Sequence, residues 1–281
     1  MTASQCIIRM QRFRELWIHT GTACNLECPF CLEGSRPGDN RLERIRLNEI
    51  KPYLDQAVQL GVERFCFTGG EPLIVKDIVK ILEYAVSLKP CMVISNGTAP
   101  LLKRLHQLQL LKQQKHPLSF RISIDHADQQ QHDKDRGWGN FQRAIEGLQL
   151  LHAQGFDIGI IRQIHEGEDE AAVLGAFQQL LRKAHLPEDI MIHALPDFGR
   201  PGMASNDTPI DMADVKYLAT LKCSHSRMLL KREGQLKISS CLFTDDDPQF
   251  DMGNSLEDAV TSDVPPSHHR CRQCLSHCID L

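Results

Sequence analysis

The chain of 281 residues has no long apolar run, and this absence sets the first limit on its function. No stretch approaches the roughly 18 apolar residues that a membrane-spanning helix needs. The first residues, MTASQCIIRMQRFR, contain no continuous apolar segment of the kind that a secretory signal peptide carries. We therefore expect a cytoplasmic protein with no membrane partner.

The sequence also lacks an excess of positive charge. Its 32 Lys and Arg residues are offset by 36 Asp and Glu residues, which leaves a formal net charge of −4. A protein that binds nucleic acid over a broad surface would be basic, so we expect no nucleic-acid partner. Internal repeats and low-complexity linkers are missing as well. The apolar content of 42% is that of an ordinary globular protein, long enough to bury a sizeable core.

The cysteine content excludes one class of protein and favours another. The 11 cysteines are too few for a small disulfide scaffold. A cytoplasmic chain keeps its thiols reduced or uses them to bind metal. Eight of the cysteines fall into two groups along the sequence. The first group is Cys24, Cys28 and Cys31, and the second is Cys223, Cys241, Cys271, Cys274 and Cys278.

The middle of the chain alternates short β-prone stretches with amphipathic helical ones. Strands are predicted at 15–20, 64–68, 91–95, 119–125, 157–162 and 190–195. Helices are predicted between them, at 47–60, at 76–88, from 100 onward, at 141–153 and at 168–184. This alternation predicts an α/β fold with a parallel sheet and outer helices. The carboxyl ends of such strands gather side chains into one site, as in TIM barrels.

The pattern changes near Gly199. The next segment is rich in Gly, Pro, Asn and Asp and is expected to be a loop, and residues 226–240 predict a hairpin that turns at Glu233-Gly234. Residues 254–260 predict a short helix. The final stretch, SHHRCRQCLSHCIDL, has almost no apolar pattern, so it needs another source of stability such as a metal site. We therefore expect a barrel at 1–200 and a small cysteine-rich domain at 201–281.

The first cysteine group directly follows the first predicted strand, where a barrel would build its site. The segment CNLECPFC, residues 24–31, places three thiols in one loop. Three thiolates can hold three irons of a [4Fe–4S] cluster and leave the fourth iron open to a ligand. A structural zinc site is the alternative, although such sites normally take four closed ligands.

A glycine-rich turn ends the second predicted strand. In the segment TGGEP, residues 68–72, paired glycines allow unusual backbone angles and a close approach by a ligand. Glu71 adds a charged acceptor. Taken alone, this motif also fits an ordinary strand-to-helix turn.

Together, the two motifs resemble the radical S-adenosylmethionine (SAM) superfamily. CNLECPFC matches the cluster loop of that family, and FTGGEP matches its SAM-binding turn. The resemblance runs from Glu15 to Leu195 and implies a partial (β/α)6 TIM-like barrel that holds a SAM-chelated [4Fe–4S] cluster. Reduction of such a cluster cleaves SAM to a 5′-deoxyadenosyl radical, which abstracts hydrogen from a substrate. The cofactor carries this chemistry, and the protein supplies placement and exclusion of water.

The resemblance also implies roles for individual residues. It implies that Cys24, Cys28 and Cys31 bind the cluster and that Phe30 lies beside the adenine of SAM. The turn that receives the SAM amino group is Gly69, Gly70, Glu71 and Pro72. Further SAM contacts are implied at the ends of later strands, at Ser95, Asn96, Ser123, Asp125 and Arg162. For these later positions, polar side chains satisfied by local hydrogen bonds are the alternative. The stretch DHADQQQHDKDRG, which contains His126, Asp133 and Arg136, also looks family-like and is expected to be a loop and helix start.

The second cysteine group resembles the auxiliary-cluster extensions of radical SAM enzymes, the SPASM and twitch domains. The corresponding cysteines are Cys223, Cys241, Cys271 and Cys274. A full SPASM domain has seven cysteines for two clusters and this tail has five, so one auxiliary [4Fe–4S] cluster is expected. Cys278 is the alternative fourth ligand or a spare thiol, and zinc is the alternative metal. We expect solvated side chains at His268, His269 and His277 and core thiols at Cys66 and Cys91, and we assign no role to Cys6.

The resemblance leaves the reaction open. Only about 14 residues precede the first predicted strand, which favours a small-molecule substrate over a peptide. The alternative is a maturase of ribosomally made peptides (RiPPs) that forms a crosslink, a thioether or an epimerised residue. A non-catalytic binding protein stapled by metal is an alternative of another class.

Other participants follow from an oxidative radical reaction. The auxiliary cluster would accept the substrate electron or bind the substrate, and an electron donor such as flavodoxin or ferredoxin would reduce the SAM cluster. A side chain near a strand end would take the proton, and the candidates are His165, His193 and Asp197.

Overall fold

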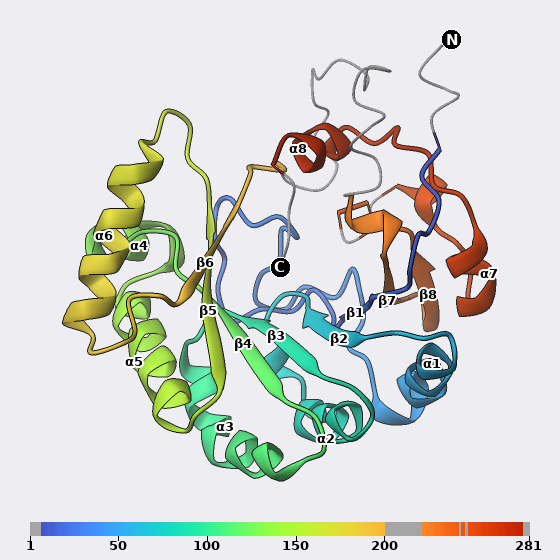
Figure 1. The fold of residues 1–281 in the computed structure, drawn as a ribbon, viewed down its shortest axis with the longest axis horizontal. Coiled ribbons are helices and arrows are strands. Elements are labelled where there is room, and N and C mark those ends of the chain that lie inside the picture. Colours follow the sequence, from blue (N-terminus) through green and yellow to red (C-terminus); the bar gives the residue numbers. More distant parts are fainter. Residues whose placement is uncertain (1–6, 200–220, 242, 245–246, 278–281) are drawn as a thin grey trace.

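The computed structural model describes residues 7–199, 221–241, 243–244 and 247–277. Within these residues, the strands form one eight-stranded sheet in the order β6-β5-β4-β3-β2-β1-β7-β8 (Figure 1). The strands are β1 (Glu15–His19), β2 (Arg64–Thr68), β3 (Cys91–Ser95), β4 (Leu118–Ser123), β5 (Asp157–Gln163), β6 (Met191–Leu195), β7 (Ser226–Arg232) and β8 (Gln235–Ser239). The helices are α1 (Leu47–Gln59), α2 (Ile78–Leu88), α3 (Ala99–Leu110), α4 (Gln129–Arg136), α5 (Asn140–Ala153), α6 (Glu170–Lys183), α7 (Leu256–Thr261) and α8 (Arg270–His277).

The sheet confirms the α/β fold and the six parallel strands expected from the sequence. Strands β1 to β6 pair in parallel from neighbour to neighbour, and α1, α2, α3, α5 and α6 lie along the outer side of the curved sheet (Figure 1). Parallel strands need crossover connections of this kind, and the helices bury their apolar faces on the sheet. The result is a partial TIM-like barrel. Among the described residues, no helix is both long and apolar enough to cross a membrane.

Each strand divides its side chains between two cores. Leu16 and Ile18 of β1 belong to the core between the sheet and the helices, whereas Trp17 belongs to a second core that also contains residues of β7. This division follows from the two-residue period of a strand. Cys66 and Cys91 are both buried, which confirms that they are core thiols.

The C-terminal hairpin continues the main sheet. β7 and β8 pair antiparallel, as the sequence predicts, and the turn contains Glu233 and Gly234, both with positive φ. β7 also pairs in parallel with β1 along residues 15–18. The segment that carries the second cysteine group is therefore attached to the barrel beside the strand that precedes the first group. The expected domain boundary at residue 200, like Cys6 and Cys278, lies outside the described residues.

Two helices differ from the sequence-based expectations. The polar stretch after β4 contains a complete helix, α4, rather than only a loop and helix start. Asp128 caps it by accepting the backbone N–H of Gln131 (2.9 Å), and it ends at Gly137, whose φ is +93°. The second helix, α8, carries Cys271 and Cys274. Besides the two cysteines, Leu275 is the one apolar residue among its eight, so little apolar pattern was present to predict it.

Candidate active site

The three cysteines of the first group lie in the loop that follows β1. Each is partly buried. The loop turns tightly, because the Cys31 N–H donates to the Cys28 carbonyl (3.2 Å) and the Gly34 N–H donates to the Cys31 carbonyl (2.9 Å). Burial, together with the charges of Glu71 and the other two thiols, raises the pKa of Cys24 to about 12. Such thiols lose their protons on binding metal, so this donor set fits a metal site.

The glycine turn after β2 packs against the backbone that leads into the cysteine loop. The Gly70 N–H donates to the Gly21 carbonyl (2.9 Å), and the Glu71 N–H donates to the Ala23 carbonyl (3.1 Å). A Cβ at Gly70 would lie 2.2 Å from the Ala23 carbonyl oxygen, and Gly69 has a φ of +135°. One glycine is therefore required by close contact and the other by backbone conformation. The two sequence motifs form a single structural unit.

Glu71 lies beneath this turn with its carboxylate buried. It accepts hydrogen bonds from the Ser95 hydroxyl (2.9 Å) and from the backbone N–H groups of Asn96 (2.8 Å) and Leu73 (3.0 Å). Burial nevertheless raises the pKa of Glu71 to about 7. Glu71 therefore joins the glycine turn to the end of β3. Pro72, which is also buried, begins the short helical turn that follows.

The segment after β3 holds the outer part of the cysteine loop. Asn96 Nδ2 donates to Asn25 Oδ1 (3.0 Å) and to Cys24 Sγ (3.8 Å). Asn25 Nδ2 in turn donates to Thr98 Oγ1 (3.0 Å). These hydrogen bonds hold Cys24 in place, both directly and through its neighbour Asn25. They also show that the polar groups of this strand end are satisfied within the protein while the segment lines the pocket.

A buried ion pair closes the opposite side of the site. Asp125, just after β4, is almost completely buried and is paired with Arg136 at the end of α4. The Arg136 guanidinium lies 5.4 Å from the centre of the Phe30 ring. Burial opposes the ionisation of Asp125, but the adjacent Arg136 lowers its pKa below the ordinary value. The same cation acts on Cys28 and offsets part of the burial that raises the pKa of that thiol.

Arg162, at the end of β5, has an acidic partner of its own. Its guanidinium donates to Glu168 Oε2 (2.9 Å) and to the Gln163 carbonyl (3.0 Å). The hydrogen bond from Arg162 lowers the pKa of Glu168. Both Arg162 and Arg136 line the pocket, and Arg136 also lies over the Phe30 ring of the cysteine loop. The sequence analysis placed Arg136 in a loop and helix start and assigned it no contact. The one hint of a role for Arg136 in the sequence was its place in the family-like stretch DHADQQQHDKDRG.

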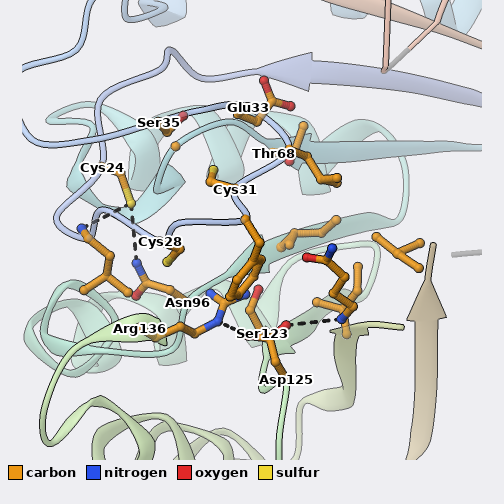
Figure 2. Close-up of a pocket in the computed structure, with 18 of the residues that line it drawn as sticks. Cys24, Cys28, Cys31, Glu33, Ser35, Thr68, Asn96, Ser123, Asp125 and Arg136 are labelled. Atoms are coloured by element: carbon orange, nitrogen blue, oxygen red, sulfur yellow. Dashed lines mark hydrogen bonds and ion pairs between the residues drawn. The ribbon is translucent and has the colours of Figure 1, made fainter. Parts of the chain in front are cut away.

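These side chains surround one pocket at the carboxyl edge of the sheet. Figure 2 shows the three cysteines on one side of it and Ser123 and Asp125 on the other. The pocket has a volume of about 150 Å³ and opens to the solvent. Of the residues proposed from the sequence, the structure brings to its lining Cys24, Cys28, Phe30, Cys31, Gly69, Gly70, Ser95, Asn96, Ser123, Asp125 and Arg162.

An acid that the sequence analysis missed also lines this pocket. Glu33 lies two residues beyond Cys31, and its Oε2 is 3.0 Å from Nε2 of the buried His19. The Gly21 N–H donates to Nδ1 of the same ring (3.2 Å), so Nε2 carries the proton and donates to Glu33. The three expected proton acceptors, His165, His193 and Asp197, are not among the lining residues.

The four described cysteines of the second group, Cys223, Cys241, Cys271 and Cys274, lie near one another. Burial raises the pKa of Cys223, and the nearby thiols of Cys241, Cys271 and Cys274 raise it further. Cys223 and Cys274 belong to the core inside the curved sheet. Within the described ranges, no group of three or more His, Cys, Asp or Glu side chains is arranged to hold a single metal ion. A [4Fe–4S] cluster gives each thiolate its own iron, so four neighbouring thiols fit its donor set.

One expectation about the surrounding histidines was wrong. His268 is buried rather than solvated, with 7% of its surface exposed. Its Nδ1 accepts the backbone N–H of Arg270 (3.2 Å), and its ring packs edge-on against Phe250 and stacks on His269. The ring therefore shapes the start of α8. The side chain of His277 lies outside the described part of the chain.

Comparisons with known proteins agree with this geometry. The sequence matches the Radical SAM superfamily over residues 18–180, more than half of the chain. It is 30% identical over 145 residues to the antilisterial bacteriocin subtilosin biosynthesis protein AlbA of Bacillus subtilis, covering 51% of this chain and 31% of that protein. It is 29% identical over 153 residues to the GTP 3′,8-cyclase of Tolumonas auensis, covering 52% of this chain and 43% of that protein. The chain spans less than half the length of both relatives.

The fold is also similar to a solved structure. SuiB of Streptococcus suis, bound to S-adenosylmethionine, superposes with a TM-score of 0.67 at 15% identity, covering 90% of this chain and 67% of that chain. At this identity the likeness concerns the fold alone. The family match spans the cysteine loop, the glycine turn and strands β2 to β5. The chain therefore belongs to the radical SAM superfamily of enzymes.

Proposed function

We propose that this chain cleaves SAM reductively and uses the 5′-deoxyadenosyl radical to modify a peptide oxidatively. The observation that carries the proposal is the junction of the two motifs. The backbone N–H groups of Gly70 and Glu71 donate hydrogen bonds to the backbone just before Cys24. These bonds fix the distance between the proposed cluster ligands and the proposed SAM-binding turn. Fixed placement of reacting groups is a main source of enzymatic rate enhancement.

The residues around the first site have distinct tasks. Cys24, Cys28 and Cys31 would hold three irons of a [4Fe–4S] cluster, and the glycine turn would receive the SAM amino group. When bound, the cluster supplies the electron that cleaves SAM. Arg136 offsets negative charge that the thiolates bring into a poorly solvated pocket, and Asp125 holds that guanidinium in place. Apolar side chains on the remaining walls would help to exclude water once SAM and substrate fill the pocket.

The second site supports an oxidative reaction. We assign one auxiliary [4Fe–4S] cluster to Cys223, Cys241, Cys271 and Cys274, where it would accept the substrate electron or bind the substrate. Two observations support this assignment. The four thiols lie together in an apolar environment, and Leu32 and Phe243 belong both to that environment and to the lining of the first pocket. The auxiliary site therefore borders the space in which the substrate would react.

The choice of a peptide replaces the small molecule that the sequence analysis favoured. That expectation depended on the short segment before β1. The relatives support a peptide better, because AlbA is named for the biosynthesis of a bacteriocin and SuiB has been solved with its precursor peptide SuiA bound. The pocket is open to solvent and has apolar side chains at Leu195, Pro196 and Phe243, which suit an inserted peptide side chain.

Metal content and SAM cleavage test the proposal first. Anaerobic purification and reconstitution should give about eight iron atoms per chain, four for each cluster. Dithionite, or reduced flavodoxin or ferredoxin as the biological donor, should then convert SAM to 5′-deoxyadenosine. A Cys24→Ala/Cys28→Ala/Cys31→Ala variant should retain the auxiliary iron and form no 5′-deoxyadenosine. Stoichiometric zinc without SAM cleavage would contradict the proposal and support a non-catalytic binding protein.

The substrate class is tested separately. Short peptides encoded beside the gene should increase the rate of 5′-deoxyadenosine formation, whereas GTP, the small molecule named for one relative, should not. Peptides deuterated at side-chain or α positions should transfer deuterium to 5′-deoxyadenosine and lose it from the product. Stimulation and deuterium transfer with a small molecule but with no peptide would overturn the peptide assignment and leave the SAM chemistry intact.

A further inference from the structure

Arg270, the first residue of α8, is almost completely buried between the two cysteine sites. Its guanidinium donates four hydrogen bonds, all to backbone carbonyls. The acceptors are Phe198 (3.0 Å), Gly199 (2.8 Å), Phe243 (3.0 Å) and Leu32 (3.2 Å). One side chain thus joins the segment beyond β6, the segment after the hairpin and the end of the cysteine loop.

Both ends of this connection belong to a cysteine site. Arg270 immediately precedes Cys271, and Cys274 follows one turn later on the same helix. Leu32 immediately follows Cys31, the third ligand proposed for the SAM cluster. The Leu32 side chain also packs against the core that contains Cys274, and it lines the candidate pocket. The end of the cysteine loop therefore lies between the candidate pocket and the auxiliary thiols.

The shape of the guanidinium explains why arginine occupies this position. Its rigid, planar fork presents five N–H donors in fixed directions, whereas a lysine ammonium is a compact charge that cannot span acceptors from three segments. Charge is the rival explanation, because Arg270 also acts on Glu33 and helps to lower its pKa against the effect of burial. A lysine variant keeps the charge and removes the fork, and so separates the two explanations.

We propose that Arg270 is a positioning residue that couples the auxiliary site to SAM binding. Metal held by Cys271 and Cys274 fixes α8, and α8 fixes the guanidinium. The guanidinium then fixes the Leu32 carbonyl next to Cys31. Occupancy of the auxiliary site thereby changes the affinity of the first site for SAM. This inference rests on the proposed function, because it requires metal at both cysteine groups.

The test uses the full chain, reconstituted without oxygen, and three readouts: iron per chain, SAM affinity, and the electron paramagnetic resonance (EPR) spectrum of the reduced cluster with and without SAM. Arg270→Gln should keep the iron of the first site but bind SAM on the order of ten-fold more weakly, within the usual range of coupling between sites. Its SAM-bound EPR spectrum should also change. Arg270→Lys should behave like Arg270→Gln. Arg182→Gln removes a charge from an exposed guanidinium on α6, away from both cysteine sites, and should match the unmodified chain.

A variant that lacks the auxiliary metal completes the test. Cys271→Ala/Cys274→Ala should weaken SAM binding by the same factor, and adding Arg270→Gln to it should cause no further loss, since both changes break one connection. Unchanged SAM affinity and EPR in Arg270→Gln, full recovery in Arg270→Lys, or additive losses would each overturn the inference. If Arg270→Gln does not fold, the lysine and cysteine variants decide. Failure of the proposed function is distinct, because the unmodified chain would then not cleave SAM.

Discussion

Gly70→Ala is the substitution that most directly tests the junction between the two motifs. The added Cβ would lie 2.2 Å from the Ala23 carbonyl oxygen, where real contacts are not shorter than 3.0 Å. The obstacle is backbone rather than a flexible side chain, so the turn and the cysteine loop must separate by about 0.8 Å. Gly70 has no positive φ, unlike Gly69, so the substitution tests the close contact without backbone strain.

The magnitude follows from two contributions. Overpacking of a well-packed region costs about 1–3 kcal/mol. Separation also weakens the hydrogen bonds from Gly70 to Gly21 and from Glu71 to Ala23, each with a net worth of about 1 kcal/mol. We therefore expect a loss of about 3–5 kcal/mol, against a typical total stability of 5–15 kcal/mol. The chain should stay folded while the cysteine loop leaves its position.

The assay combines urea unfolding with the iron content and SAM cleavage of the reconstituted protein. Gly70→Ala should lower the free energy of unfolding, lose about half of the iron and form no 5′-deoxyadenosine. Gly175→Ala in α6 is the matched control, because a Cβ there meets nothing within 4 Å. It should leave both sites intact and raise the stability by about 0.5–1 kcal/mol. Full iron content, SAM cleavage and unchanged stability in Gly70→Ala would refute the reasoning.

Three further predictions follow from other buried groups. Cys271→Ala/Cys274→Ala should keep about four iron atoms per chain; loss of all iron would show that the two sites are not separate. Asp125→Asn should destabilise the fold by about 3–5 kcal/mol, because it leaves the Arg136 charge buried and unpaired; a urea titration in which Asp125→Asn and Arg136→Met are additive would contradict this. Burial lowers the pKa of His132 to about 4, below its value in the unfolded chain. The unfolded chain therefore binds more protons than the folded one, and the free energy of unfolding falls as the pH drops from about 6.5 towards 4. The loss between pH 7 and 5 should be about 2 kcal/mol, measured by urea unfolding of the metal-free chain, and an equal loss in His132→Gln would contradict the assignment.

The parts that were predicted correctly are those with a local signal. The parallel strands and their crossover helices follow from apolar spacing, which repeats every two or about 3.6 residues. The first cysteine group occupies eight consecutive positions, so its three thiols share a loop whatever the rest of the chain does. The glycine turn is equally local. Its role, however, became defined only when the structure placed Gly70 against Ala23, which lies on another strand connection.

The remaining features depend on contacts between distant segments. α4 is almost entirely polar, and its Arg136 gains a role only by reaching Asp125 and Phe30 across the site. α8 has only Leu275 as an apolar residue besides its two cysteines, and its Arg270 donates to a carbonyl 238 positions earlier in the chain. The sequence by itself identified the cysteines that are candidates for binding the clusters, and it placed the first group in the loop after the first strand. Tertiary structure decided which charged side chains line the candidate pocket and how the two cysteine groups are joined. Hydrogen bonds and ion pairs depend on distance in space, so they leave no period in the sequence.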